Sequence, residues 1–347
     1  MTDRWHKFAA LFTPELKVLS QEFRKHSYQI RVIGGAVRDV VAGSFPADID
    51  LATDCPAQNV DRVCQPFYFR ALHKGGENAS GATANMEDLY TLMVWIPIAP
   101  GSTSVAFLSG SHSERRDVAR ACQHYNVDTS VKFAMFEITS LRKILTREAC
   151  EDPWQCDARG RDFTINAMSV DEDGRLYDYL GGERHMLEHR IIWCGAVGDR
   201  VVEAPYRVLR YFRFHGQMCH EQQSHDTEVL RSMALHNELL PSIPGKVTWK
   251  LLRQIIHGAG PCAALNELQT MSIFGMLEKI LPAHCSVNLI EVERVISLHL
   301  DADTRRVPVV VEESHHRPVA VMAAMLSYKA DAIASLAKDY GWSEDEI

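Results

Sequence analysis

The chain has 347 residues, of which 46% are hydrophobic and 24% are charged, and its formal net charge at neutral pH is −8. This length and apolar content suffice for sizeable cores and predict two or three domains. The acidic balance argues against indiscriminate nucleic-acid binding, although it leaves room for a local basic face.

The nine cysteines include no Cys-x-x-Cys pair and lie at irregular spacings. This usage is typical of reduced intracellular thiols rather than of a zinc site or a disulfide framework. Residues Met1–Ala10 are polar and lack the apolar core of a secretory signal, and no Arg-rich transit peptide is visible. The sequence therefore predicts an intracellular protein.

The first predicted element is a helix that begins at Thr13 and Pro14. Threonine is a favoured N-cap residue, and proline is well suited to the first helical turn. Leu16, Leu19 and Phe23 then fall on one face. We expect this helix to pack against a core along that apolar stripe.

A glycine-rich turn follows a short apolar strand predicted at Ile30–Ile33. Gly34 and Gly35 let the backbone turn tightly into a helix predicted at Ala36–Ala42, whose N-terminal N–H groups can face an anion. The guanidinium of Arg38 can reach the same anion. This pattern predicts a phosphate-binding turn.

Two aspartates accompany the next predicted strand, Ile49–Ala52. Asp48 and Asp50 are two residues apart, so on a strand their side chains leave the same face. Mg²⁺ prefers such oxygen ligands, with water and phosphate oxygens completing its coordination. The sequence predicts a shared cation site here.

The block from about Met86 to Lys132 combines an apolar run at Leu89–Pro100 with a Ser-rich, charged stretch. The apolar run is too short for a membrane span, which needs ~20 residues. We expect an exposed, poorly ordered excursion. It is either a lineage-specific insertion or the product of a translated intron or another gene-model artefact.

Two further strands are predicted at Phe136–Leu141 and around Ala167–Val170. Glu137 alternates with apolar neighbours along the first of them. Its carboxylate could supply a further metal ligand or an orienting contact, but a structural salt bridge is the favoured interpretation.

Beyond Pro205 the chain reads as mostly helical. Helices are predicted at Tyr206–Met218, Asp226–Leu235, Trp249–Ile256, Ala263–Met271, Leu289–Leu298 and Pro318–Leu336. Arg207, Arg210 and Arg213 recur at steps of three and therefore keep to one side of the first of these helices. This basic stripe suits phosphates or base edges, and the alternative is a solvated helical face.

Several motifs follow one another in a fixed order: Phe12–Leu16, Gly34–Asp54, Phe136–Arg142, Asp157–Ala167, Gly174–Asp178 and Glu203–Phe214. In this order they resemble a class II CCA-adding enzyme (tRNA nucleotidyltransferase, mitochondrial type), from the family that includes bacterial poly(A) polymerases within the DNA polymerase β superfamily. The resemblance continues through Arg213 and fades towards the C-terminus. The number of ordered motifs makes chance similarity implausible.

The resemblance implies an α+β fold class. It implies a nucleotidyltransferase head with a small mixed β-sheet at residues 1–180, carrying the atypical insertion at about 86–132. An all-helical neck for nucleotide-base recognition would occupy residues 181–260, and an all-helical body residues 261–347. The family's helical tail would begin beyond Ile347.

The resemblance also implies roles for individual residues. The nucleotide-binding residues would be Gly34, Gly35, Arg38, Arg161, Arg207, Arg210 and Arg213, and the catalytic and metal-binding residues Asp48 and Asp50. Arg207 is the last residue of the element Glu-Asp-x-x-Arg. In the family, the Asp and the Arg of this element recognise the Watson–Crick edge of the nucleotide base. Ala204 stands at that Asp position, and Glu203 is the neighbouring carboxylate that could substitute.

The implied activity is template-independent addition of CCA to tRNA 3′ ends from CTP and ATP, by Mg²⁺-dependent nucleotidyl transfer. The implied partners are tRNA, ATP and CTP, with no membrane, and the oligomeric state is left open. Ala204 suggests an alternative, a related RNA nucleotidyltransferase with relaxed specificity that adds poly(A) or CC. The insertion suggests another, a catalytically degenerate RNA-binding product. Location would be mitochondrial, cytoplasmic–nuclear, or both.

Overall fold

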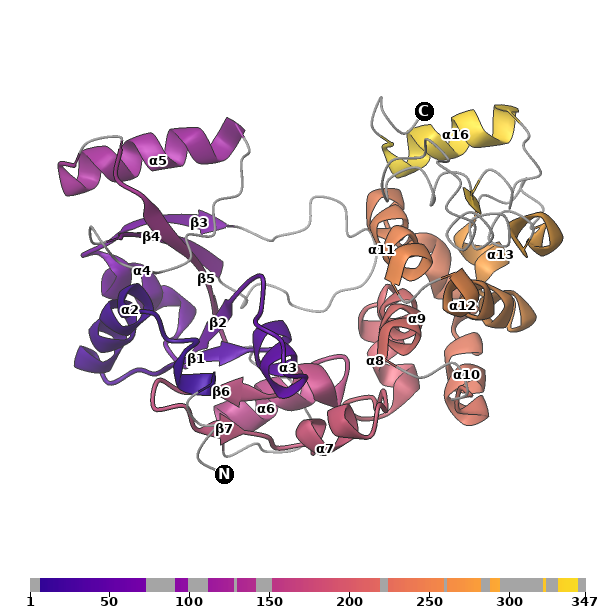
Figure 1. The fold of residues 1–347 in the computed structure, drawn as a ribbon, viewed down its shortest axis with the longest axis horizontal. Helices are drawn as coiled ribbons and strands as arrows, with labels where there is room; N and C mark the ends of the chain where they lie inside the picture. The colour runs from indigo at the N-terminus through magenta and orange to yellow at the C-terminus, as the bar shows by residue number, and fades with distance from the viewer. Residues whose placement is uncertain are drawn as a thin grey trace, which may run out of the picture. The chain divides into compact units, whose positions relative to one another are not determined.

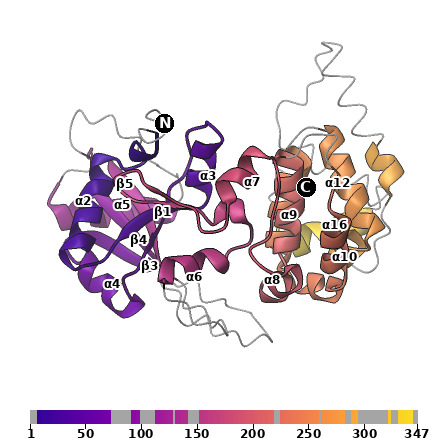
Figure 2. The same cartoon turned by 90° about the horizontal axis from the view of Figure 1, so that it is seen from below.

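The computed structural model describes residues 7–72, 91–98, 112–127, 130–141, 152–218, 224–258, 261–281, 288–293, 321–322 and 330–342. The chain divides into two compact units, Met1–Glu188 and His189–Ile347. Among the described elements, all strands belong to the first unit, and the second is helical (Figures 1 and 2). This confirms the predicted α+β class, whereas the division of the helical part into a neck and a body stays a prediction.

The first unit is built around one seven-stranded mixed sheet (Figure 1). In spatial order its strands are β3 (Tyr68–Leu72), β4 (Thr91–Pro97), β5 (Phe133–Ser140), β2 (Asp50–Thr53), β1 (Ile30–Ile33), β6 (Ser169–Val170) and β7 (Leu176–Tyr177). β2 and β5 run parallel, and the other neighbours run antiparallel. The predicted strands correspond to β1, β2, β5 and β6, whereas β3, β4 and β7 were not predicted.

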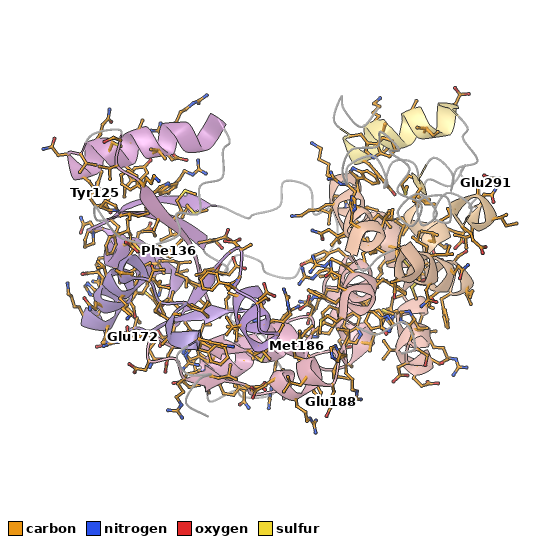
Figure 3. All side chains as sticks on the ribbon, in the orientation of Figure 1. Tyr125, Phe136, Glu172, Met186, Glu188 and Glu291 are labelled. Atoms are coloured by element: carbon orange, nitrogen blue, oxygen red, sulfur yellow. The ribbon has the colours of Figure 1, made fainter. Side chains whose placement is uncertain are left out.

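One face of this sheet carries the main hydrophobic core. Val32, Leu51 and Ile138 point into it and are fully buried. Phe136 belongs to the same cluster, and Met186 packs against it (both labelled in Figure 3). The helices that contribute to the cluster are α2 (Pro14–Lys25), α3 (Gly35–Val41) and α4 (Ala57–Cys64). The opposite face is therefore the one available for a polar site.

Helix α2 confirms the predicted helix start at Thr13 and Pro14. The Thr13 hydroxyl accepts a hydrogen bond from the Leu16 amide at 3.3 Å, which satisfies one of the first-turn donors. Leu16, Leu19 and Phe23 are fully buried, as the apolar stripe predicted.

The prediction of an exposed excursion is wrong for residues 91–98 and 112–127, which are part of the packed fold. β4 pairs with β3 on one side and with β5 on the other. Val94 points into the main core, whereas Trp95 points to the opposite face and packs with Ala121 and Cys122 of α5 (His112–Tyr125). The apolar run exists because β4 is buried on both faces, a pattern that lacks simple alternation. The rest of the block lies largely outside the described residues.

Three short helical elements complete the first unit: α6 (Pro153–Arg159), the 3-10 helix η2 (Thr164–Asn166) and α7 (Gly182–Leu187). Asp152 caps α6 by accepting a hydrogen bond from the Trp154 amide at 2.9 Å. The buried Trp154 ring then packs on Ile33 and Ala52, on the face of the sheet opposite the main core. An apolar wall thus covers part of that second face.

The second unit is an assembly of helices. They are α8 (Val197–Glu203), α9 (Arg207–Met218), α10 (Thr227–Ala234), η3 (Asn237–Ser242), α11 (Gly245–Gly258), α12 (Pro261–Ile273), α13 (Leu277–Ile280) and α16 (Ala330–Tyr340). α11 packs against α9, α12 and α16. The first four helices predicted beyond Pro205 are confirmed, with α11 and α12 longer than expected. The described residues of the helices predicted at 289–298 and 318–336 are 289–293, 321–322 and 330–336, and all of them are helical, whereas the rest of both predictions lies outside the described residues.

The cysteine prediction needs one correction. The cysteines that are not disulfide-bonded include Cys55, Cys64, Cys122 and Cys194, as expected, but Cys156 on α6 is disulfide-bonded. Spacing along the chain does not show which thiols meet in space, so the sequence could not reveal this bond. Burial, reinforced by the charge of Asp54, raises the pKa of the Cys55 thiol to about 12.

Within the described part of the chain, no helix combines the length and the apolar character needed to cross a membrane.

Candidate active site

Two carboxylates, those of Asp50 and Glu137, lie on the sheet face opposite the main core, and Asp48 lies two residues before β2 begins. Asp48 and Asp50 are both exposed and flank Ile49, which is buried. Asp50 opens β2, and its register partner on the parallel strand β5 is Glu137, which is half-buried. Register partners on neighbouring strands project from the same face of a sheet. The structure therefore adds Glu137 to the two aspartates found from the sequence.

The turn after β1 has the backbone that its glycines predicted. Gly34 has a φ of +66°, a conformation that residues with a Cβ rarely adopt. A Cβ at Gly34 would lie 3.7 Å from the Nη1 atom of Arg161, and one at Gly35 would lie 3.7 Å from the Nη2 atom of Arg38. Both predicted arginines thus lie against the glycine turn, and we call these four residues the arginine cradle.

Each arginine of the cradle is held by a nearby acceptor. Arg38 donates to the Asn166 side-chain oxygen at 2.7 Å and to the Asp39 carboxylate at 2.9 Å. Arg161 donates two hydrogen bonds to one carboxylate oxygen of Asp157, at 2.6 and 2.9 Å. Planar guanidinium groups held in this way keep a fixed orientation towards an anion.

Asn166 lies inside the Asp157–Ala167 motif, and the sequence alone did not indicate a role for it. Its side-chain nitrogen donates to the Asp162 carboxylate at 3.1 Å, so its oxygen is aimed at Arg38. Both Asn166 and Asp162 are buried. Asp162 and Asn166 are two polar residues at a spacing of four within this motif, and that pattern is the signal that could have identified them.

Helix α7 packs against η2, which carries Asn166, and holds it in place. The Thr164 hydroxyl and the His185 Nδ1 atom form a buried hydrogen bond of 2.9 Å. Gly182 approaches η2 so closely that a Cβ there would collide with the Thr164 carbonyl. The position of Arg38 therefore depends on packing between α7 and η2.

Arg31 is a further buried cation beside the carboxylate face. Its guanidinium lies 4.0 Å from the centre of the Trp154 ring and 3.6 Å from that of Tyr177. Its Nη1 atom also donates to the Tyr179 hydroxyl at 3.4 Å. These contacts are typical of an arginine that fixes α6 and β7 onto the sheet rather than one that contacts a ligand.

In the second unit, Arg207 is buried and paired. Its Nη1 atom lies 2.8 Å from one oxygen of Glu203, whose other oxygen lies 2.8 Å from the Nη2 atom of Arg200. Arg207 also donates to the Arg200 carbonyl at 3.3 Å. Ala204 ends α8, and its methyl group offers no hydrogen-bonding atom. The Glu203 carboxylate is thus engaged by two arginines of its own unit.

The other two arginines of the predicted stripe share an aromatic neighbour. The guanidinium of Arg213 lies 4.1 Å from the centre of the Phe214 ring, and that of Arg210 lies 5.4 Å from it. Arg213 also donates to the Gln254 side chain on α11 at 2.8 Å. Arg210 and Arg213 are half-buried, so a fully solvated helical face does not describe them.

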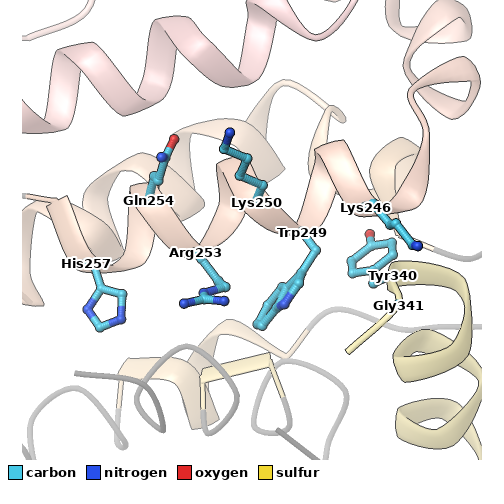
Figure 4. A pocket seen from close by; sticks show the side chains of 8 residues that line it. All are labelled: Lys246, Trp249, Lys250, Arg253, Gln254, His257, Tyr340 and Gly341. Atoms are coloured by element: carbon cyan, nitrogen blue, oxygen red, sulfur yellow. The ribbon is translucent and has the colours of Figure 1, made fainter. Parts of the chain in front are cut away.

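A pocket of about 490 Å³ lies along α11 (Figure 4). Lys246, Lys250, Arg253 and His257 line it, together with Trp249 and with Tyr340 of α16. Figure 4 shows Arg253 and His257 on the same side of α11 as Trp249. Basic side chains beside aromatic rings suit the phosphates and bases of a nucleic acid.

The structure therefore arranges the predicted residues in two sets. Gly34, Gly35, Arg38, Arg161, Asp48 and Asp50 belong to the first unit, and Arg207, Arg210 and Arg213 belong to the second.

The family model of the poly A polymerase head domain matches residues 30–192. Residues 30–192 therefore resemble a poly A polymerase head domain, and we call this stretch the head domain. The head domain includes the arginine cradle and the helix α7 that packs against η2. It also includes the carboxylates of Asp48, Asp50 and Glu137.

Curated relatives extend the similarity beyond the head domain. The mitochondrial CCA tRNA nucleotidyltransferase 1 of Homo sapiens is 30% identical over 252 residues, which are 73% of this chain and 49% of that protein. The CCA-adding enzyme of Bacillus licheniformis is 30% identical over 208 residues, 60% of this chain and 42% of that enzyme. The chain spans about half the length of the curated relatives it matches.

Solved structures support the fold of the head domain and of the helices that follow it. A complex of a CCA-adding enzyme with CTP has a TM-score of 0.62 at 17% identity and covers 95% of this chain and 67% of that one. At this level of identity, the likeness shows a shared fold.

Proposed function

We propose that this chain is an RNA nucleotidyltransferase that adds CCA to tRNA 3′ ends from CTP and ATP. The observation that supports the proposal is the register of Asp50 with Glu137 in the same head domain as the arginine cradle, because carboxylates suit a metal ion and guanidinium groups suit a triphosphate. The names of curated relatives agree with this activity. Mitochondrial or cytoplasmic–nuclear location stays a prediction.

Nucleotidyltransferases of this family depend on divalent metals. The donor set of this chain fits Mg²⁺, because carboxylate oxygens on one sheet face are the ligands that this ion prefers. Asp48 and Asp50 would hold it, and Glu137 would orient or extend the set. Bound there, the ion would lower the pKa of the attacking hydroxyl and neutralise developing negative charge.

The residues of the chain would position the reactants. Arg38 and Arg161 would bind the triphosphate through guanidinium groups already oriented by Asn166 and Asp157. The terminal tRNA hydroxyl would then form its bond to the α-phosphorus as the bond to pyrophosphate breaks. The basic pocket along α11 would offer contacts to tRNA phosphates.

A direct test uses the purified chain, Mg²⁺ and a tRNA that lacks its terminal CCA. We expect CTP alone to extend it by two residues, ATP alone to add little, and both together to complete CCA. Sequencing of the extended 3′ ends measures this outcome. Binding of nucleotide without any extension would instead favour the degenerate RNA-binding product.

A second candidate function, nucleotide addition with relaxed base selection, is favoured by Ala204. Two residues that recognise a base edge together need a hydrogen-bond acceptor at this position, and Ala204 has none. Arg207 already forms an ion pair with Glu203. We expect Ala204→Asp to increase the discrimination between correct and incorrect nucleotides by roughly 5-fold to 150-fold, since a good base-edge pair contributes about 1–3 kcal/mol. The measurement is the ratio of kcat/KM for CTP and ATP on tRNA ending before the first C.

Ala196→Asp is the matched control for this substitution. Ala196 is exposed at the N-cap of α8, so the variant adds the same charge at the other end of the same helix. We expect it to leave the ratio unchanged. Equal ratios in both variants and in the parent would contradict the base-reading role of position 204.

A further inference from the structure

Two histidines and a glutamate form a buried cluster in the second unit, away from the proposed nucleotide chemistry. His215 lies on α9, His225 on the segment just before α10, and Glu267 on α12. Their side chains are 7%, 5% and 2% exposed, respectively. Three charged or titratable groups at this depth require partners, because desolvation of an unpaired charge is costly.

The hydrogen bonds within the cluster leave two buried atoms without partners among the described residues. His215 Nδ1 lies 2.7 Å from Glu267 Oε1, a short hydrogen bond. His225 Nε2 lies 3.3 Å from Glu267 Oε2, but this contact lacks hydrogen-bond geometry, and both atoms stay unsatisfied. Native proteins rarely leave such atoms without a partner, so both atoms are available to a bound ion.

The remaining nitrogen of His225 has its own partner. Its Nδ1 atom lies 3.3 Å from the hydroxyl of Tyr211. Metal-binding histidines commonly hydrogen-bond through the ring nitrogen that does not bind the metal, which fixes the tautomer and the ring orientation. The contact with Tyr211 leaves the Nε2 atom of His225 as the nitrogen that can bind an ion.

The carboxylate of Glu267 is suited to act as an anionic ligand. Its Oε1 atom faces His215 and its Oε2 atom faces His225, so the carboxylate contacts both imidazoles. A divalent cation would also relieve the cost of placing two histidines and one anion in an apolar interior.

We propose that His215, His225 and Glu267 form a binding site for a divalent transition-metal ion of the zinc type. One ligand atom from each residue can be chosen so that all three lie within 4.8 Å of one another. Ligands of a tetrahedral zinc ion with bonds of about 2.0–2.2 Å lie roughly 3.3–3.5 Å apart, close to the 3.3 Å between His225 Nε2 and Glu267 Oε2. Two imidazoles and a carboxylate are a ligand set that zinc accepts, with water in the fourth position.

Metal binding requires one local movement. The two imidazole rings stack with their centres 3.6 Å apart and their planes 19° apart. A nitrogen lone pair lies in the plane of its ring, so two nearly parallel rings do not aim at one ion. The ring of His225 must rotate, and it belongs to the chain segment before α10 rather than to a helix.

The site would tie α9, α12 and the segment before α10 together at one point. His215 follows Arg213 by two residues on α9, so the ion would stabilise the helix that carries the arginine stripe. The proposal is independent of CCA addition, because its ligands differ from those proposed for catalysis.

Cobalt absorption provides the test. The full chain in an Asp48→Asn/Asp50→Asn background, which removes the head carboxylates, is stripped with a chelator and titrated with Co²⁺. We expect one equivalent to produce the strong visible bands of a tetrahedral site, to be displaced by Zn²⁺, and to raise the midpoint of thermal unfolding. His225→Asn and Glu267→Gln should lose the bands. His236→Asn should keep them, because His236 of the same unit bonds the Ser232 carbonyl outside the cluster.

X-ray absorption of the zinc-loaded parent chain provides a measurement that does not depend on the folding of variants. Nitrogen and oxygen neighbours at about 2.0–2.2 Å are expected, whereas a sulfur shell at about 2.3 Å would assign the ion to cysteines and overturn the proposal. The proposal would also be overturned if the chain failed to bind one equivalent of Co²⁺, or if His225→Asn gave the same bands as the parent. The cluster would then be a set of three side chains held by hydrogen bonds alone.

Discussion

Replacing Asp50 with asparagine is expected to lower kcat for CTP incorporation by at least roughly 10²–10³-fold, the usual effect of removing one preorganised electrostatic group. The substitution keeps the size of the side chain but removes a charge from the carboxylate face shared with Glu137. We expect the head domain to remain folded, because Asp50 is exposed at the start of β2. Steady-state extension by CTP of a tRNA that lacks its terminal CCA measures the loss.

Asp54→Asn is the matched control, since Asp54 follows the last residue of the same strand. Asp54 accepts a hydrogen bond from the Gln29 amide at 2.7 Å, and an asparagine oxygen can accept it too. We expect incorporation within a few-fold of the parent. If Asp50→Asn retained activity similar to that of Asp54→Asn, the metal-binding assignment of β2 would be wrong.

Gly182→Ala is expected to lower both the free energy of unfolding and the affinity for nucleotide. A Cβ at this position collides with the Thr164 carbonyl, so α7 and η2 must separate. Overpacking of this kind costs about 1–3 kcal/mol of unfolding free energy. Because η2 carries Asn166, which holds Arg38, we also expect the KM for CTP to rise. Urea denaturation and steady-state kinetics give the two values.

Leu187→Ala tests whether any change in α7 has the same effect. Leu187 is the last residue of the same helix and is 56% exposed. Its replacement should alter unfolding free energy by less than about 0.5 kcal/mol, as is usual at surfaces. A Gly182→Ala variant with parental stability and KM would show that η2 is not held in place by α7.

The features that the sequence predicted well depend on local chemistry. The turn at Gly34 requires a positive φ, and the start of α2 follows from a threonine cap and a proline, so few alternatives exist at either place. The alternation of Asp48 and Asp50 is likewise local. Nearly all of the proposed catalytic residues could therefore be identified before their neighbours were known.

The features that the sequence missed depend on contacts between distant segments. Glu137 was assigned mainly to a salt bridge because only the register of β5 against β2 shows that it faces Asp50. β4 was taken for an excursion because burial on both faces removes the alternation that marks a strand. The triplet of Arg200, Glu203 and Arg207 depends on how α8 meets α9.

The parallel pairing of β2 with β5 has a consequence for how this head domain can vary and fold. The residues that face each other across that pairing, Asp50 and Glu137, are separated by the whole of α4, β3, β4 and α5. Long-range closure of this kind makes the carboxylate face one of the slower parts of the fold to assemble. Each doubling of the length of a flexible connection adds only about 0.6 kcal/mol to the entropy cost of closure. The segment between the two strands can therefore lengthen considerably while the pair that it joins keeps its register.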